Sequence, residues 1–155
     1  MRCIFVIVLV ALSFVSTAPT RNNLVEDLNK LNVERSLQHK RISLKCQILF
    51  WQKAVENKNN KQTDIEKMQM LLDQYVYWDK TWPRSISEED YRKIEKSVGL
   101  WTEKPSFDTL NSYVNGDFHV IKLKYEEMRK QMFDDFHTRE TEIIRLYKEA
   151  GHTDA

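Results

Sequence analysis

The last third of the chain, residues 106–149, carries the most regular pattern in the sequence and constrains the fold more than any other feature. Apolar residues recur there in steps of three and four, which place them on one face of an α-helix because a helix turns once every 3.6 residues. A helix over the whole stretch would be roughly 60 Å long. Such a helix cannot bury its apolar face alone, so the rest of the chain must supply partners. The pattern consists of Phe107, Leu110, Val114, Phe118, Ile121, Tyr125, Met128, Met132, Phe136, Ile143 and Tyr147.

The pair Asn115-Gly116 interrupts this pattern. A glycine in a helix interior costs about 1 kcal/mol relative to alanine. The flanking residues keep helical rather than alternating spacing, which argues against a β-hairpin around this pair. We therefore expect a break or kink that separates a short helix over 106–114 from a long helix over 117–149. A single continuous helix is the alternative.

A second long helix is expected near the start of the chain, over about 23–57. Asn23 and Glu26 have the spacing of a capping pair that satisfies free backbone N–H groups. Arg35 and Gln38 interrupt the apolar face of this helix, which is typical of a helix that projects past its partners or of a contact that sets register. The face itself consists of Leu24, Leu28, Leu31, Ile42, Cys46 and Leu49.

Near its C-terminal end this helix is apolar on nearly every side, through residues 48–51 and the following Ala54 and Val55. A segment that is apolar all round is expected to be buried on several sides. Residues 56–61 are polar and rich in asparagine, so we expect an exposed loop there.

Two shorter helices are expected between the long ones. Thr63 and Glu66 match a capping box at the start of the first, which should stop near Pro83 because proline disfavours helical geometry at the preceding residue. Ser87 is expected to cap the second, and Gly99 marks its end.

Two further local signals accompany these helices. Ile86 and Tyr91 flank the Ser87 cap at the spacing of a hydrophobic staple. Ser106 or Asp108 is expected to cap the short helix that follows.

These elements predict an all-α fold. The chain has only three glycines and three prolines, which argues against a turn-rich β-fold. Four to five helices, two of them long (about 23–57 and 117–149), indicate an elongated antiparallel bundle in which the long helices are neighbours. Residues 19–155 are expected to form one helical domain.

The first residues have the pattern of a cleavable secretory signal peptide. Arg2 precedes an apolar run over residues 4–15, and Ser16 and Ala18 suit the positions three and one before a cleavage site. A helix of about 12 residues reaches about 18 Å, which is too short for a hydrocarbon core of about 30 Å. We therefore expect removal of residues 1–18 and a secreted, extracellular protein without a transmembrane segment. An uncleaved membrane anchor is the alternative.

Charge and cysteine content narrow the choice of partner. The chain has 24 basic and 23 acidic residues, and loss of Arg2 with the signal peptide leaves 23 of each. This balance gives no reason to expect binding to nucleic acid. Cys3 also leaves, so Cys46 remains as the one cysteine and no intrachain disulfide can form. Cys46 is expected to be a small buried residue; the alternative is an interchain disulfide in a homodimer.

No motif in the sequence indicates catalysis. There is no Gly-rich phosphate loop, no nucleophile elbow and no Cys-His pairing. Asp134, His137 and Glu140 share one helical face, which is half of a metal site in a helical bundle, but no second carboxylate-His motif completes it. A solvated face is the simpler interpretation. We expect a protein that is not an enzyme and binds no metal or cofactor.

Residues 75–82 have the most unusual local composition, because two tyrosines and two tryptophans fall within eight residues. Exposed Trp and Tyr are enriched where proteins bind one another. Tyr77, Trp78 and Trp82 are therefore candidates for partner contact. Packing in a core layer with Trp101, or lining of a site for an apolar ligand, are the alternatives.

The function expected from these features is that of a secreted, non-enzymatic interaction protein, a helical ligand, antagonist or effector that binds another protein. This step rests on analogy between folds. The alternative is an extracellular carrier that holds a lipid or another apolar small molecule between its helices. Its cavity would be lined by the adaptable side chains of Met68, Met70, Met128 and Met132.

Overall fold

The computed structural model describes residues 21–83, 87–101, 103 and 105–151. This part of the chain contains helices and no strand, so the predicted all-α fold is confirmed. The two longest helices fall within about two residues of their predicted bounds. The five helices are α1 (Arg21–Glu56), α2 (Gln62–Lys80), α3 (Glu88–Val98), α4 (Phe107–Tyr113) and α5 (Phe118–Glu149).

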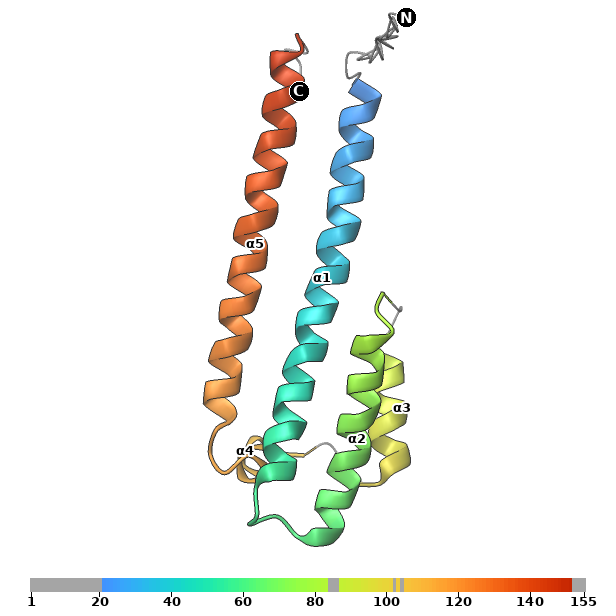
Figure 1. Cartoon of the computed structure of the whole chain (residues 1–155), viewed down its shortest axis with the longest axis vertical. Coiled ribbons are helices and arrows are strands. Elements are labelled where there is room, and N and C mark those ends of the chain that lie inside the picture. The colour runs from blue at the N-terminus through green and yellow to red at the C-terminus, as the bar shows by residue number, and fades with distance from the viewer. Residues whose placement is uncertain (1–20, 84–86, 102, 104, 152–155) are drawn as a thin grey trace, which may run out of the picture.

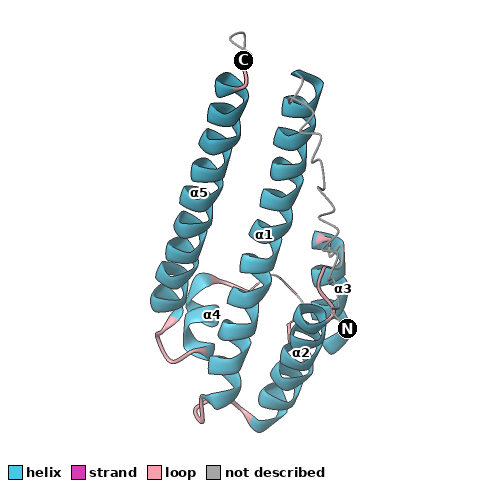
Figure 2. Ribbon diagram, turned by 45° about the horizontal axis from the view of Figure 1, so that its top comes forward, coloured by secondary structure: helices cyan, strands magenta, loops and turns pink. Residues whose placement is uncertain are grey.

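Helix α1 is the centre of an elongated, antiparallel arrangement (Figure 1). Helix α5 runs antiparallel to α1 along its whole length, and α2 packs on the other side of the lower half of α1. Helix α3 lies against α2, and α4 crosses the base of the molecule (Figure 2). The upper half of α1, residues 21–40, extends beyond α2 and α3. Together with residues 132–149 of α5 it forms a two-helix projection that we call the arm.

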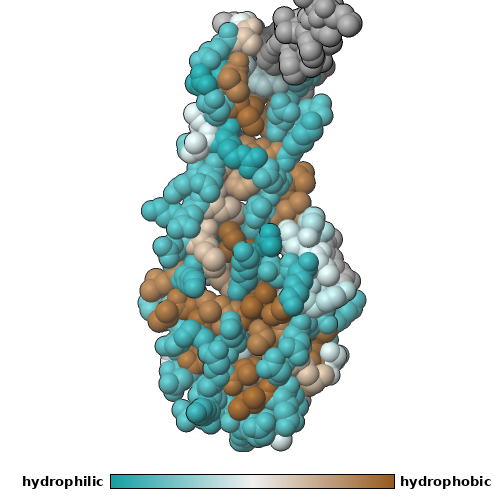
Figure 3. Space-filling model, in the orientation of Figure 1, coloured by the Kyte–Doolittle hydropathy of each residue, from teal (hydrophilic) through white to brown (hydrophobic). Residues whose placement is uncertain are grey.

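The main core lies at the base, where α1 is covered from both sides. Trp51 of α1 is only 1% exposed and shares one buried cluster with Met68 and Tyr75 of α2 and Ile121 of α5. This burial confirms the expectation that the segment around residues 48–51 is enclosed on several sides. Apolar surface is concentrated in the lower part of the molecule, and a narrower apolar strip runs upward between the long helices (Figure 3).

The arm has a smaller core of its own. Leu31 of α1 is buried with Met132 and Phe136 of α5, and Ile42 and Ile143 pack against them. One helix supplies each side of this core, so the outward sides of both helices in the arm remain polar or partly exposed. None of the helices in the described ranges has a segment both long and apolar enough to cross a membrane.

Several predicted helix ends are confirmed. The Ser87 hydroxyl accepts a hydrogen bond from the Asp90 N–H at 3.2 Å, and the Asp90 carboxylate accepts one from the Ser87 N–H at 2.8 Å. Gly99 ends α3 with φ +61°. Of the two candidate caps for α4, Ser106 is the one observed, since its hydroxyl accepts from the Thr109 N–H at 3.2 Å.

Two predicted caps are wrong. Helix α2 begins at Gln62 after Lys61, so Thr63 lies inside its first turn and does not cap it. The Asn60 amide donates to the Ala54 carbonyl at 2.7 Å, and this contact with the end of α1 fixes the chain just before α2 starts. Asn23 is not a cap either, because the backbone is already helical at Arg21.

Two other predictions concern residues that the structure does not describe. The signal peptide of residues 1–18 and Ile86 of the hydrophobic staple lie outside the described ranges. Both stay predictions from the sequence.

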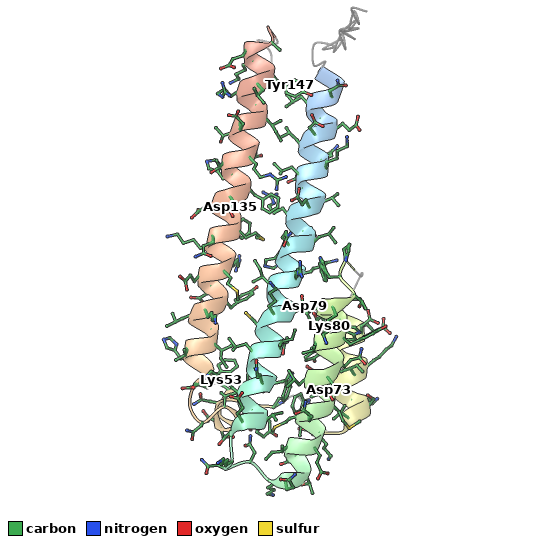
Figure 4. All side chains as sticks on the ribbon, viewed as in Figure 1. Lys53, Asp73, Asp79, Lys80, Asp135 and Tyr147 are labelled. Atoms are coloured by element: carbon green, nitrogen blue, oxygen red, sulfur yellow. The ribbon has the colours of Figure 1, made fainter. Side chains whose placement is uncertain are left out.

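The expected break at Asn115-Gly116 is confirmed. Asn115 adopts a left-handed conformation with φ +54°, followed by Gly116 at φ +90°. The Gly116 N–H donates to the Asn111 carbonyl at 2.9 Å, which closes a Schellman motif at the end of α4. Lys53 of α1 then forms an ion pair of 2.7 Å with Asp117, the residue before α5. The turn is therefore tied to the central helix at the position of Lys53 (Figure 4).

The polar loop between α1 and α2 does more than connect them. Nδ2 of Asn57 donates to the carbonyls of Ser112 and Tyr113 at 3.1 and 3.0 Å. Nδ2 of Asn60 also donates to the Tyr113 carbonyl, at 2.9 Å. Lys58 and Asn59 are exposed as expected, whereas Asn57 and Asn60 are half-buried. The loop thus holds the C-terminal end of α4 against the base of α1.

Candidate functional site

The aromatic segment at the end of α2 contributes mainly to the core. Trp78 is only 6% exposed, and its ring lies 5.5 Å from Tyr75 and 5.3 Å from Tyr91 between centroids. Trp82 is half-buried against the same cluster. Tyr77 is 52% exposed. Of the three residues predicted to contact a partner, Tyr77 is the one whose ring is mostly exposed. Trp78 instead packs in the core, which was the alternative prediction.

A polar contact lies within this aromatic core. The Tyr75 hydroxyl donates to the Glu95 carboxylate at 3.3 Å and so links α2 to α3. Burial raises the pKa of Glu95, and the hydrogen bond from Tyr75 lowers it by less. Burial also raises the pKa of Tyr91 to about 12. The fully buried Trp51 Nε1 has no hydrogen-bond partner among the residues described. Of these groups, only Tyr75 and Glu95 form a hydrogen bond between α2 and α3.

The best candidate for a binding surface is a continuous stripe on α1. Its members recur in steps of three and four and therefore lie on one side of the helix. Its lower members, from Leu44 down, pack in the core that α1 shares with α2. The Nε of Arg41 donates to Asp79 of α2 at 3.1 Å, at the last turn of α2 (Figure 4). The whole stripe consists of Val33, Leu37, Arg41, Leu44, Ile48, Trp51 and Val55.

Above Arg41 the stripe continues without α2. We call Val33 and Leu37 the upper stripe; Val33 is 62% exposed and Leu37 is half-buried. An ion pair of 2.7 Å between Lys30 and Glu26 follows on the same side of the arm. Lys40 is exposed beside the lower end of the upper stripe. The surface is thus a short apolar strip bordered by charges.

A second candidate is a groove of about 660 Å³ between α1 and α5 in the arm. Its floor includes Met128 and Met132, two of the four methionines proposed to line a ligand cavity. The other two lie elsewhere, because Met68 is buried in the main core and Met70 is exposed on α2. The rim is polar, with Asp135 (labelled in Figure 4) and other charged groups above the apolar floor.

A charged pair closes one end of that groove. Arg139 of α5 donates from both terminal nitrogens to the Glu34 carboxylate of α1, at 2.8 and 2.7 Å. The Arg139 guanidinium lowers the pKa of Glu34. This two-pronged contact links the two helices of the arm across the edge of the groove.

Cys46 is half-buried on the side of α1 that faces α5, and it forms no disulfide within the described residues. Burial raises the pKa of its thiol, while the charge of Lys124 lowers it by less. Cys46 is therefore half-buried and not the fully buried residue that was expected, and the interchain disulfide of the alternative stays a prediction.

Among the described residues, the carboxylate and histidine side chains do not gather into a metal site. Asp134 and His137 are both exposed on the outer side of α5. Within the described ranges, no group of three or more His, Cys, Asp or Glu side chains is placed to hold a metal ion. His39 instead lies 3.2 Å from the Tyr125 hydroxyl, a contact between the long helices.

Sequence reasoning missed the upper stripe as a binding surface. Val33 and Leu37 fall between the residues of the predicted apolar face, which is the face that packs on α5. The steps from Leu37 through Arg41 to Leu44 were visible in the sequence, but only the position of α2 shows where the stripe becomes uncovered.

Comparisons of the chain with protein-family models, with curated proteins and with solved structures find no match. The class defined by the structure itself is an all-α protein with antiparallel helix packing and a projecting two-helix arm.

Proposed function

We propose that this protein is a secreted, non-enzymatic interaction protein that binds another protein through its arm. The proposal rests on one observation: the stripe on α1 extends beyond the end of α2. Apolar side chains that α2 covers at the base continue upward into the exposed Val33 and the half-buried Leu37. Exposed apolar strips bordered by charges are typical of protein-protein contact sites.

Two further features support this class of function. The chain after removal of residues 1–18 has equal numbers of acidic and basic residues, and its sequence lacks motifs for catalysis. The polar contacts described above link helices to one another, as Arg139 does with Glu34 and Tyr75 with Glu95. These contacts describe a helical scaffold that presents a helix surface.

Capture experiments test the proposal. The tagged chain is incubated with a mixture of secreted and cell-surface proteins, beside a Val33→Gln/Leu37→Gln double variant. A Val120→Gln/Leu123→Gln variant is the matched control, because both residues are exposed apolar positions on α5 outside the arm. We expect a protein that the wild type and control recover and the arm variant loses. Recovery of no protein by the wild type would contradict the proposed function.

Export is tested separately in a eukaryotic secretory cell. The full chain with a C-terminal tag should appear in the medium, with an N-terminus at or near Pro19. A chain that stays in the cell with Met1 intact would contradict secretion, whatever the capture experiment shows.

A carrier of an apolar small molecule is the second candidate, supported by the groove in the arm with Met128 and Met132 in its floor. Its volume of about 660 Å³ lies in the range of ligand sites. Native mass spectrometry of the purified protein would reveal a bound lipid as added mass. Loss of that mass in a Met128→Glu variant would favour the carrier, whereas a protein without added mass, even after incubation with a fatty acid, would count against it.

A further inference from the structure

We infer that the upper stripe binds a short amphipathic helix of the partner, laid end to end with α2 along α1. The inference rests on the proposed function and specifies its partner. It begins from an interface that already exists within the chain. Helix α2 covers the lower part of the α1 stripe, and the same side of α1 continues upward with the same steps.

The end of α2 is set by its own sequence and not by the end of the stripe. Its last helical residue is Lys80, and Pro83 follows shortly afterwards. Proline disfavours helical geometry at the residue before it, so α2 cannot continue upward. The α1 surface above that point is therefore shaped for a helix that this chain's α2 does not supply.

The pattern on α1 selects a helix over an extended segment. Val33, Leu37 and Arg41 are four residues apart, so they form a ridge that can pack into a groove on the surface of a second helix. Helix-in-groove recognition uses such spacing on the partner as well, with apolar residues at i, i+3 or i+4, and i+7. The partner should therefore present two or three apolar residues at those steps.

Charge at the junction indicates a further property of the partner. At the end of α2 the Asp79 carboxylate accepts from Arg41. Lys40, the next residue on α1, is exposed beside the upper stripe. An acidic residue near the end of the partner helix would meet Lys40 as Asp79 meets Arg41. The partner segment is thus apolar on one face and acidic at the end next to α2.

A second copy of the chain fits this surface poorly. Two α1 helices packed antiparallel about the midpoint of Val33 and Leu37 would place Lys30 of one copy opposite Lys40 of the other. Like charges opposed across an interface disfavour association. The apolar strip of two residues is also small beside what a stable dimer buries.

A displayed library of amphipathic helical peptides tests the inference directly. Peptides with randomised apolar and charged positions are selected on the secreted chain, and individual binders are then measured by titration. Binding should weaken by at least about tenfold in Val33→Gln/Leu37→Gln and stay unchanged in Val120→Gln/Leu123→Gln. Circular dichroism spectra that match the wild type establish that both variants are folded. Enriched sequences should carry acidic residues near one end.

Each other outcome overturns the inference. The selection could enrich no helical peptide. Alternatively, the selected peptides could bind the Val33→Gln/Leu37→Gln variant as tightly as the wild type. A wild-type dimer in sedimentation that the double variant abolishes would assign the surface to a second copy. A captured protein that depends on Val33 and Leu37 but binds through a segment that is not helical would leave the proposed function standing while the inference fails.

Discussion

Arg41 of α1 donates a hydrogen bond from its Nε to the Asp79 carboxylate of α2, over 3.1 Å. This pair marks the point at which α1 changes from a helix with neighbours on two sides to one half of the arm (Figure 1). Below it the apolar stripe lies in the main core, and above it Val33 is largely exposed. At this boundary α1 changes from a helix of the core to the helix that carries the surface we propose for a partner.

Alanine substitutions at Trp78 and Tyr77 should separate core from surface in the aromatic segment. Trp78 is 6% exposed, so Trp78→Ala should lower the free energy of unfolding by about 3–5 kcal/mol. Tyr77→Ala should change it by less than about 0.5 kcal/mol, because this ring is more than half exposed. Urea unfolding followed by circular dichroism measures both. Equal losses in the two variants would show that the ring of Tyr77 also packs.

Glu95 should make stability depend on pH. Its pKa is raised above 4.5 in the folded protein, mainly by burial, so the folded chain holds the proton more tightly than the unfolded chain. This contribution to stability is complete below the unfolded pKa and is lost as the pH rises through the folded pKa. Glu95→Gln has no carboxyl group to ionise, so it does not lose this stability as the pH rises. Its side-chain amide oxygen still accepts a hydrogen bond from the Tyr75 hydroxyl. The variant should therefore gain stability relative to wild type as the pH rises from the unfolded pKa of Glu95 through its raised folded pKa.

Urea unfolding of wild type and Glu95→Gln at a series of pH values measures this difference. Glu89→Gln is the control, since Glu89 is an exposed carboxylate on the same helix, paired with Lys93. A Glu95→Gln variant whose difference from wild type is the same at every pH would show that the carboxyl titrates as it does in the unfolded chain.

The two asparagines that hold α4 should each contribute to stability. Asn57→Ala and Asn60→Ala remove hydrogen bonds to the Tyr113 carbonyl, at 3.0 and 2.9 Å. Each loss should cost about 1–2 kcal/mol, because a half-buried carbonyl loses a donor. Lys58→Ala, an exposed change in the same loop, should cost less than about 0.5 kcal/mol. Thermal unfolding of the three variants side by side measures the effect, and equal midpoints would refute it.

Cys46 should react slowly and leave the protein without an interchain disulfide. Burial raises the pKa of its thiol, and reaction requires the thiolate. Reaction with a thiol reagent at neutral pH should be several-fold slower than in the urea-unfolded chain. Non-reducing electrophoresis should give a monomer band. A dimer band that disappears on reduction would support the alternative, a disulfide-linked homodimer.

Capping and helix-breaking residues correctly predicted those helix ends that are stabilised by hydrogen bonds between residues close in sequence. Ser87, Gly99 and Ser106 act within three residues of themselves, and each is found where it was expected. The break at Asn115-Gly116 belongs to the same group, because left-handed backbone is a property of these residue types. Thr63 failed as a cap because α2 starts two residues earlier, after Lys61, where the contact of Asn60 with α1 holds the chain.

The aromatic segment shows why exposure was harder to predict. Trp78 and Tyr75 are three residues apart and share a face, but α2 has α1 on one side and α3 on the other. A helix with two neighbours buries a wider arc than one apolar stripe suggests, so Trp78 is enclosed and Tyr77, one residue earlier, is not.

The sequence by itself determined the helices of this protein, because periodicity, capping and helix breaking depend on residues a few positions apart. It also determined that α1 and α5 are both long and that α1 is apolar all round near residues 48–51. Only the tertiary structure decided which sides of α1 are covered, since that depends on where α2 lies and where it ends. The exposed upper stripe of Val33 and Leu37 follows from that long-range packing, which no local pattern specifies.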